Sequence, residues 1–104
     1  MQVGRVIGNV WATQKAESLT GMRLLLVRPF SAGEKESEEI IVAGDPLGAG
    51  IGETVLLAYG RAARTVLGSQ DIAWQVAVVG IVDSIHLADG GVFELAGDGT
   101  RIPV

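Results

Sequence analysis

The glycine-rich stretch from Gly44 to Val55 constrains the fold of this chain more than any other segment. Within residues 44–52 the chain carries four glycines and one proline, and an apolar segment lies on each side. This glycine density indicates backbone conformations that side chains forbid, either for tight turning or for close approach by another group. Three interpretations follow: a loop that holds phosphate, a hairpin turn, or a loop packed against a second copy of the chain.

The composition predicts one domain with more apolar surface than a small monomer needs. The chain has 104 residues, of which 48% are apolar and 19% are charged, and its mean hydropathy is +0.39. A chain of this length can bury one core, but twenty charged residues cover little of the remaining surface. Either small residues cover the rest, or part of the surface is buried against partners, and we favour partners.

Charge and residue usage argue against several classes of protein. The net charge is −4 and the eight Lys and Arg residues are scattered, which disfavours nucleic-acid binding. The chain has no cysteine, which excludes disulfides and thiolate metal sites and fits a cytosolic protein. It has no apolar run of about 18 residues and no basic segment followed by an apolar one, so we expect neither a membrane span nor a signal peptide.

Residue patterns predict an all-β fold, a small five-stranded barrel with one short helical turn. Strands are expected at 1–12, 22–30, 39–43, 53–59 and 75–82, the last of them buried on both faces. The helical turn is expected at 61–67, with Gly68 as its C-terminal stop. Residues 31–39 are expected to form a solvated loop.

Two further features concern the ends of the chain. Gly4 and Gly8 lie in the first strand and indicate a bend or a close approach by another backbone. In the tail, turn signals at 89–91 and 98–99 flank Val92 to Leu95, which predicts a small hairpin or an edge strand.

The glycine stretch is a poor phosphate loop. Its spacing is G-x-G-x-G rather than G-x-G-x-x-G, and no Lys-Ser or Lys-Thr pair follows. The next segment, from Thr54 to Leu57, has the pattern of a strand. Both nucleotide motifs instead need a helix there, whose N-terminal amides face the phosphate.

No other arrangement of residues indicates catalysis, and we predict neither an enzyme nor a bound cofactor or metal. His86 is the only histidine; Ser84 would share its side of a strand, but no orienting acid is evident. Asp45 and Glu53 flank the glycine stretch, where acids more often accept backbone N–H groups than catalyse. Trp11 and Trp74 are expected to be core or interface residues.

Three ordered blocks of sequence resemble the EutN/CcmL family of bacterial microcompartment vertex proteins. The blocks are Met1 to Lys15 continued by Leu19 to Leu25, Asp45 to Val55 with Gly60 to Arg64, and Val78 to Asp83. The chain departs from the family pattern at Trp74-Gln75, where the family typically has an acidic residue that Asp71 could replace. It also departs at Arg61-Ala62, where small hydroxyl residues are common.

The resemblance implies a five-stranded barrel similar to the oligonucleotide-binding fold, without catalytic activity. It implies a homopentamer at the vertices of a polyhedral shell built mostly of hexameric proteins, in the bacterial cytoplasm. The barrel would span residues 1–85, and the tail 86–104 would pack on the barrel or on a neighbouring subunit. The alternative from a different class is a small barrel that binds a ligand or single-stranded nucleic acid.

The resemblance also suggests which residues form the site. The expected subunit interface or axial loop consists of Asp45, Gly48, Ala49, Gly50, Gly52 and Glu53. Further motif positions are Gly4, Gly8, Lys15, Gly60, Arg64 and Asp83. Valine at Gly50 or Gly52 is expected to hinder ring assembly, by steric block or by denying a positive φ.

Overall fold

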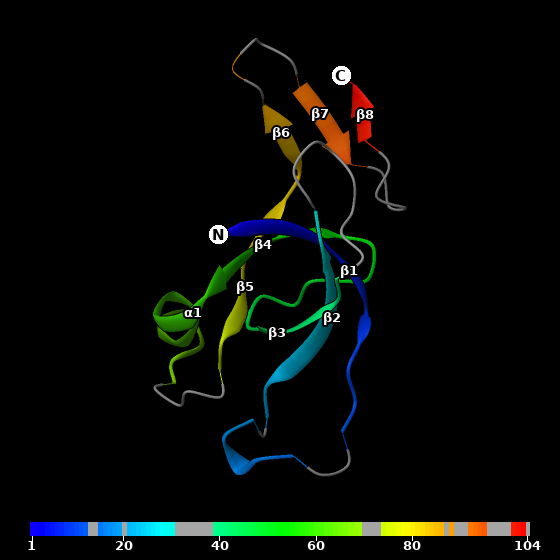
Figure 1. The fold of residues 1–104 in the computed structure, drawn as a ribbon. Coiled ribbons are helices and arrows are strands. Elements are labelled where there is room, and N and C mark those ends of the chain that lie inside the picture. Colours follow the sequence, from blue (N-terminus) through cyan, green and yellow to red (C-terminus); the bar gives the residue numbers. More distant parts are fainter. Residues whose placement is uncertain are drawn as a thin grey trace.

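The fold is a closed barrel of five strands with one helix and a separate small sheet (Figure 1). The structure is a computed structural model that describes residues 1–12, 15–19, 21–30, 39–69, 74–86, 88, 92–95 and 101–103. The barrel strands are β1 (Gln2–Asn9), β2 (Arg23–Pro29), β3 (Ile41–Asp45), β4 (Thr54–Tyr59) and β5 (Val76–Val82). Their order around the barrel is β1-β2-β3-β5-β4. The predicted fold class is therefore confirmed.

Alternation along the strands produces the core. In β2, Leu25 and Val27 are fully buried, whereas Leu24 and Leu26, which alternate with them, are only half-buried. Successive side chains of a strand point to opposite faces, so the buried set faces the barrel interior. The core consists of Val6, Leu25, Val27, Ala43, Ala49, Val55, Leu57 and Val78.

The two glycines singled out in β1 differ in their surroundings. A Cβ on Gly4 would lie 2.8 Å from Val27 Cγ1 and 3.1 Å from the backbone oxygen of Arg28, so β2 approaches β1 too closely for a side chain. The pairing of β1 with β2 shifts register between Val6 and Gly8, which is a bulge. The predicted close approach is confirmed at Gly4, whereas Gly8 lies at the bulge and a Cβ there would meet Leu26 at an ordinary 3.9 Å.

The helix α1 (Gly60–Leu67) joins β4 to β5 and covers part of the barrel. Gly68 ends it in the left-handed conformation, with φ 71°, and its backbone N–H reaches the carbonyls of Arg64 and Thr65. Next to the helix, Trp74 is 4% exposed and lies over Gly44 together with Leu67. The predicted helix and its glycine stop are confirmed.

The prediction that β5 is buried on both faces is wrong at its C-terminal end. Val78 is fully buried, but Ile81 is 41% exposed. In the described structure the pairing of β5 with β3 is a single parallel bridge, Gly44 to Ala77. β4 still pairs with β5 at this end, through Val55 and Ile81, but the pairing with β3 stops at Ala77. An apolar run predicts burial only where other elements also cover the faces of the strand.

A second sheet follows the barrel. The strands β6 (Ser84–His86), β7 (Val92–Leu95) and β8 (Arg101–Pro103) pair antiparallel in that order. Only Asp83 separates β5 from β6, and the sheet stands beyond one end of the barrel (Figure 1). The predicted hairpin at Val92 to Leu95 is confirmed, since β7 pairs antiparallel with its neighbours, but the bounds of β6 and β8 were not predicted. The expected turns at 89–91 and 98–99 and the loop at 31–38 lie outside the described residues.

We predict that Gly44→Ala destabilises the fold. The new Cβ would lie 2.7 Å from Trp74 Cζ3 and 3.1 Å from Leu67 Cδ1. Overpacking of this kind should lower the free energy of unfolding by about 1–3 kcal/mol. Urea denaturation at fixed protein concentration measures this loss.

Gly80→Ala is the matched control, because a Cβ there would meet Leu56 at an ordinary 3.6 Å. It should leave the free energy of unfolding unchanged or raise it by up to about 1 kcal/mol. Equal losses in the two variants would contradict the assigned contact with Trp74.

Candidate subunit interface

The carboxylate of Asp45 shapes the start of the glycine loop, which we define as residues 46–53 between β3 and β4. Its Oδ1 accepts hydrogen bonds from the backbone N–H groups of Leu47 (3.0 Å) and Gly48 (3.1 Å), and Oδ2 accepts one from Ala49 (2.9 Å). The Asp45 side chain has no exposed surface. A buried carboxylate is stable only when it is hydrogen-bonded and paired, and both conditions are met here.

Arg23 supplies the opposite charge. Its Nη1 lies 3.0 Å from Asp45 Oδ2 and also donates to the backbone oxygen of Ala49 at 2.6 Å. The Ala49 side chain is fully buried in the barrel core. The start of β2 and the end of β3 therefore together hold the glycine loop against the barrel.

The far end of the glycine loop pairs with β1. The N–H of Gly52 donates to the carbonyl of Val6 (2.8 Å), and the N–H of Val6 donates to the carbonyl of Glu53 (2.9 Å). The Glu53 carboxylate accepts the N–H of Gly50 at 2.6 Å. Asp45 and Glu53 thus accept backbone N–H groups, as the sequence predicted, each at its own end of the loop.

The glycines of the loop have different roles. Gly48 (φ 83°) and Gly52 (φ 91°) have positive φ angles, with no atom within 4 Å of a Cβ on Gly48. Gly50 is not among the residues with positive φ, and its Cβ would meet only the flexible Glu53 carboxylate, at 3.1 Å. The positive φ angles of the turn account for glycine at positions 48 and 52 without reference to a second subunit. Gly50 needs no special backbone conformation.

The described loop exposes apolar side chains at its surface. Ile51 is 62% exposed and Leu47 is half exposed, and Glu53, the last residue of the loop, is exposed as well. The inner side of the loop is therefore bound to the barrel by hydrogen bonds, and its outer side carries exposed apolar side chains. A subunit contact would use this outer side.

The other motif positions are spread over the molecule. Lys15 is exposed in the connection from β1 to β2, and Asp83 is exposed between β5 and β6. Gly60 begins α1 with φ 59° and donates its N–H to the carbonyl of Gln75 (2.8 Å). Arg64 donates from Nη1 to the carbonyl of Trp74 (3.4 Å). These two residues join the helix to the segment that enters β5.

Sequence reasoning missed the role of Arg23 and the apolar outer surface of β2 and β3. Leu24 and Leu26 alternate with the buried residues of β2, and Val42 beside them on β3 is 47% exposed. The unbroken run from Leu24 to Val27 was the available signal. A barrel strand that is apolar on both faces needs a cover outside as well as inside.

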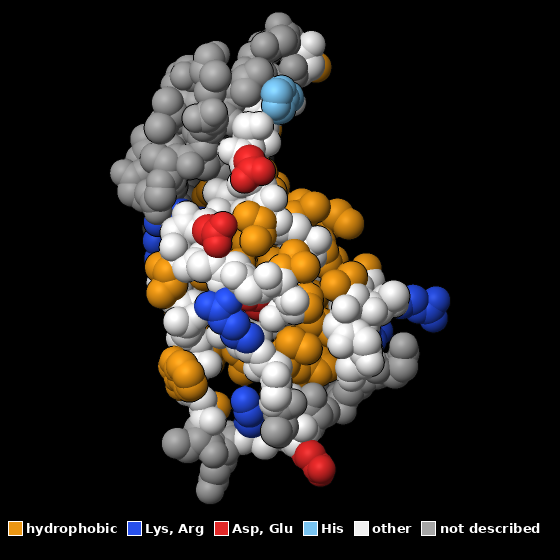
Figure 2. Space-filling model, turned by 180° about the vertical axis from the view of Figure 1, so that it is seen from behind, with side chains coloured by type: hydrophobic (Ala, Val, Ile, Leu, Met, Phe, Trp, Pro, Cys, Tyr) orange, Lys and Arg blue, Asp and Glu red, His pale blue; other side chains and the backbone are white. Residues whose placement is uncertain are grey.

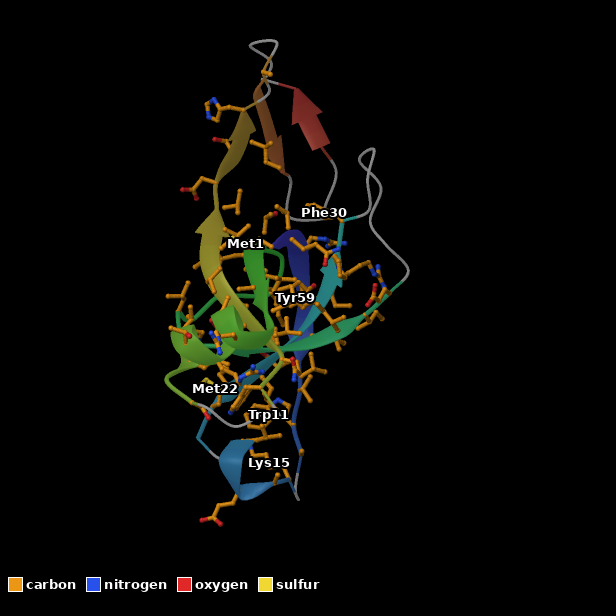
Figure 3. All side chains as sticks on the ribbon, turned by 60° about the vertical axis from the view of Figure 1, so that its left-hand side comes forward. Met1, Trp11, Lys15, Met22, Phe30 and Tyr59 are labelled. Atoms are coloured by element: carbon orange, nitrogen blue, oxygen red, sulfur yellow. The ribbon has the colours of Figure 1, made fainter. Side chains whose placement is uncertain are left out.

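The two tryptophans differ in environment. Trp74 is a core residue, whereas Trp11 is 90% exposed at the end of β1. Trp11 lies near Lys15 and Met22 at the end of the molecule opposite β6–β8 (Figure 3). These residues border a hollow of about 460 Å³, whose lining is Asn9, Val10, Trp11, Ala12, Lys15, Gly21, Met22, Arg23 and Leu24.

Two further polar contacts lie away from the glycine loop, on β6 and at the end of β4. Ser84 Oγ and His86 Nε2 lie 3.0 Å apart on exposed β6. Tyr59 donates to Gln2 Oε1 at 2.5 Å, and burial, with a smaller contribution from the charge of Glu39, raises the pKa of Tyr59 above its usual value. The described residues contain no group of three or more potential metal ligands and no helix suited to crossing a membrane.

Comparison with known proteins identifies the family. The family model described as "Ethanolamine utilisation protein EutN/carboxysome" matches residues 1–83. This chain belongs to that family. Its members are structural shell vertex proteins rather than enzymes, in agreement with the resemblance seen in the sequence. The chain is accordingly a component of a bacterial microcompartment shell.

Individual relatives cover most of the chain. The carboxysome shell vertex protein CcmL of Synechocystis is 41% identical, over 95% of this chain and 99% of its own length. The vertex protein PduN of Salmonella typhimurium is 48% identical, over 82% of this chain and 98% of its own length. GrpN from Rhodospirillum rubrum is a pentameric microcompartment shell protein of known structure. Its structure superimposes with a TM-score of 0.73 and 39% sequence identity, over 85% of this chain and 100% of GrpN.

We predict that Asp45→Ala destabilises the fold by at least about 2 kcal/mol, because it removes the acceptor of three backbone N–H groups and the partner of Arg23. Glu53→Gln keeps an acceptor oxygen at an exposed position, so it should cost less than about 0.5 kcal/mol. Chemical denaturation of both variants at equal concentration checks this. Similar losses would rule out the assigned role of Asp45.

We further predict that Gly52→Ala costs about 1–3 kcal/mol of folding free energy, because alanine disfavours the φ of 91°. Gly50→Ala should cost less, since it only displaces an exposed carboxylate. Thermal unfolding of both variants at one protein concentration provides the comparison. An equal or larger loss at Gly50 would refute the backbone explanation.

Proposed function

We propose that this chain forms homopentamers that occupy the fivefold vertices of a microcompartment shell. The observation that carries the proposal is family membership over most of the chain, together with the pentameric character of GrpN. Flat tiles cannot close a shell, whereas a fivefold unit introduces curvature. A protein that closes a shell in this way needs contact surfaces and no reacting groups.

The surface of the chain supports this proposal. Outward positions of the barrel carry Leu24, Leu26 and Val42, where a barrel exposed to water would carry polar residues. Figure 2 shows hydrophobic and uncharged atoms over much of the described surface, with few charged side chains among them. Burial of such a surface between subunits would provide the free energy of assembly.

A closed ring of five copies needs two different surfaces on each subunit. In a head-to-tail contact, one patch of each copy meets another patch of the next, and the rotation between them closes the ring. We infer that the outer surface of β2 and β3 is one of these patches. The small sheet β6–β8, which stands beyond one end of the barrel (Figure 1), would lie against a neighbouring subunit.

We also propose that the pentamer binds hexameric shell proteins at its rim. Coexpression of the chain with such hexamers, followed by electron microscopy of the particles, tests this step. Closed polyhedral particles are expected with the chain, and open or elongated ones without it. Closed particles in both cases would refute the vertex role.

The proposed oligomeric state predicts the mass of the particle in solution. Light scattering should give about 54 kDa, five times the 10.8 kDa chain. Val42→Glu places a charge on the apolar outer surface and should shift the mass toward that of single chains, with the circular dichroism unchanged.

Ala62→Glu introduces the same group at an exposed position in the first turn of α1 and is the control. It should leave the pentamer intact. A wild-type chain that remains monomeric at micromolar concentration would refute the proposed assembly.

A further inference from the structure

The Trp11 hollow, defined by the nine lining residues given above, is a basic and apolar site in an acidic protein. Among the described residues its lining includes Lys15 and Arg23 and no carboxylate, although the chain as a whole has a net charge of −4. Trp11 is 90% exposed, and Met22 and Leu24 are half-buried beside the hollow. An exposed tryptophan beside a hollow of this size is typical of a binding surface.

The charges of the hollow are not equally available. Arg23 already binds Asp45 and the carbonyl of Ala49. Lys15 is exposed, and within the described part of the chain no carboxylate lies within ion-pairing distance of it. A ligand of the hollow would therefore combine apolar groups for Trp11 with a negative charge for Lys15.

The glycine loop of the same chain has this complementary chemistry. Leu47 and Ile51 are exposed apolar side chains, and the exposed Glu53 follows two residues after Ile51. The loop is held in shape by Asp45 and β1, so its outer side is presented without further ordering. Preorganisation of this kind lowers the entropic cost of binding.

We propose that the Trp11 hollow of one subunit receives the outer side of the glycine loop of the next subunit in the ring. Ile51 and Leu47 would contact Trp11, and Glu53 would pair with Lys15. The inference rests on the proposed pentamer. It deepens that proposal by naming two unlike surfaces, as a head-to-tail ring needs, and by giving Lys15 and Glu53 a shared role.

Charge reversal provides the first test, with full-length protein in a dilution series followed by mass photometry. Lys15→Glu and Glu53→Lys should each raise the concentration at which half of the rings dissociate roughly threefold to tenfold. The double variant restores opposite charges at every contact and should return this concentration to near the wild-type value. Arg61→Glu, an equal charge change on α1, is the control and should have little effect.

The environment of Trp11 provides the second test. Trp11→Ala should raise the half-dissociation concentration roughly tenfold to a hundredfold. Acrylamide quenching of tryptophan fluorescence is measured on wild-type and Trp11→Phe rings. The difference between the two signals reports the exposure of Trp11 itself, since Trp74 is buried in both. We expect Trp11 to be protected in the ring and accessible in the dissociated Val42→Glu chain.

The possible outcomes are distinct. Intact rings with an accessible Trp11, or a double variant no better than the two single variants, would overturn this inference and leave the pentamer standing. In that case, protection of Trp11 only after addition of a hexameric shell protein would assign the hollow to that partner. A wild-type protein without rings would refute both proposals together.

Discussion

The paired, buried carboxylate of Asp45 is the interaction on which the glycine loop depends. It binds three consecutive backbone N–H groups of the loop and the guanidinium of Arg23, and it lies at the junction of two barrel strands. Without an acceptor these buried donors would destabilise the fold. The same contacts direct Ala49 into the core and leave Leu47 and Ile51 outside. The Asp45 side chain thus determines which residues of the loop face the core and which face outward.

Much of the barrel could be predicted from the sequence because its signals are local. Apolar runs bounded by turn residues predicted the five strands, and Gly68 predicted the end of the helix. The close approach at Gly4 could be predicted because a glycine inside a strand usually marks a bend or a place where another backbone comes close. The short strands β6 and β8 could not be predicted in this way, since three residues give no detectable alternation.

The site was predictable in part. Asp45 and Glu53 were recognisable as loop-flanking acids, and their bonds to backbone N–H groups followed from that position. The pairing with Arg23 is separated by 22 residues in sequence, so no local pattern reveals it. The two tryptophans have similar local sequence contexts but opposite exposure, because burial depends on which elements cover a residue. The distinction between Gly50 and Gly52 likewise needed backbone angles.

The strand order has a consequence for the order of folding. β5 lies between β3 and β4, so residues 1–59 alone can form only an open sheet in the order β4-β1-β2-β3. Both outer strands of that sheet present unpaired edges until β5 inserts between them. During synthesis, the nascent chain therefore passes through a stage in which these edges can pair with another chain. A microcompartment vertex protein is most exposed to misassembly at that stage, before residue 82 is available.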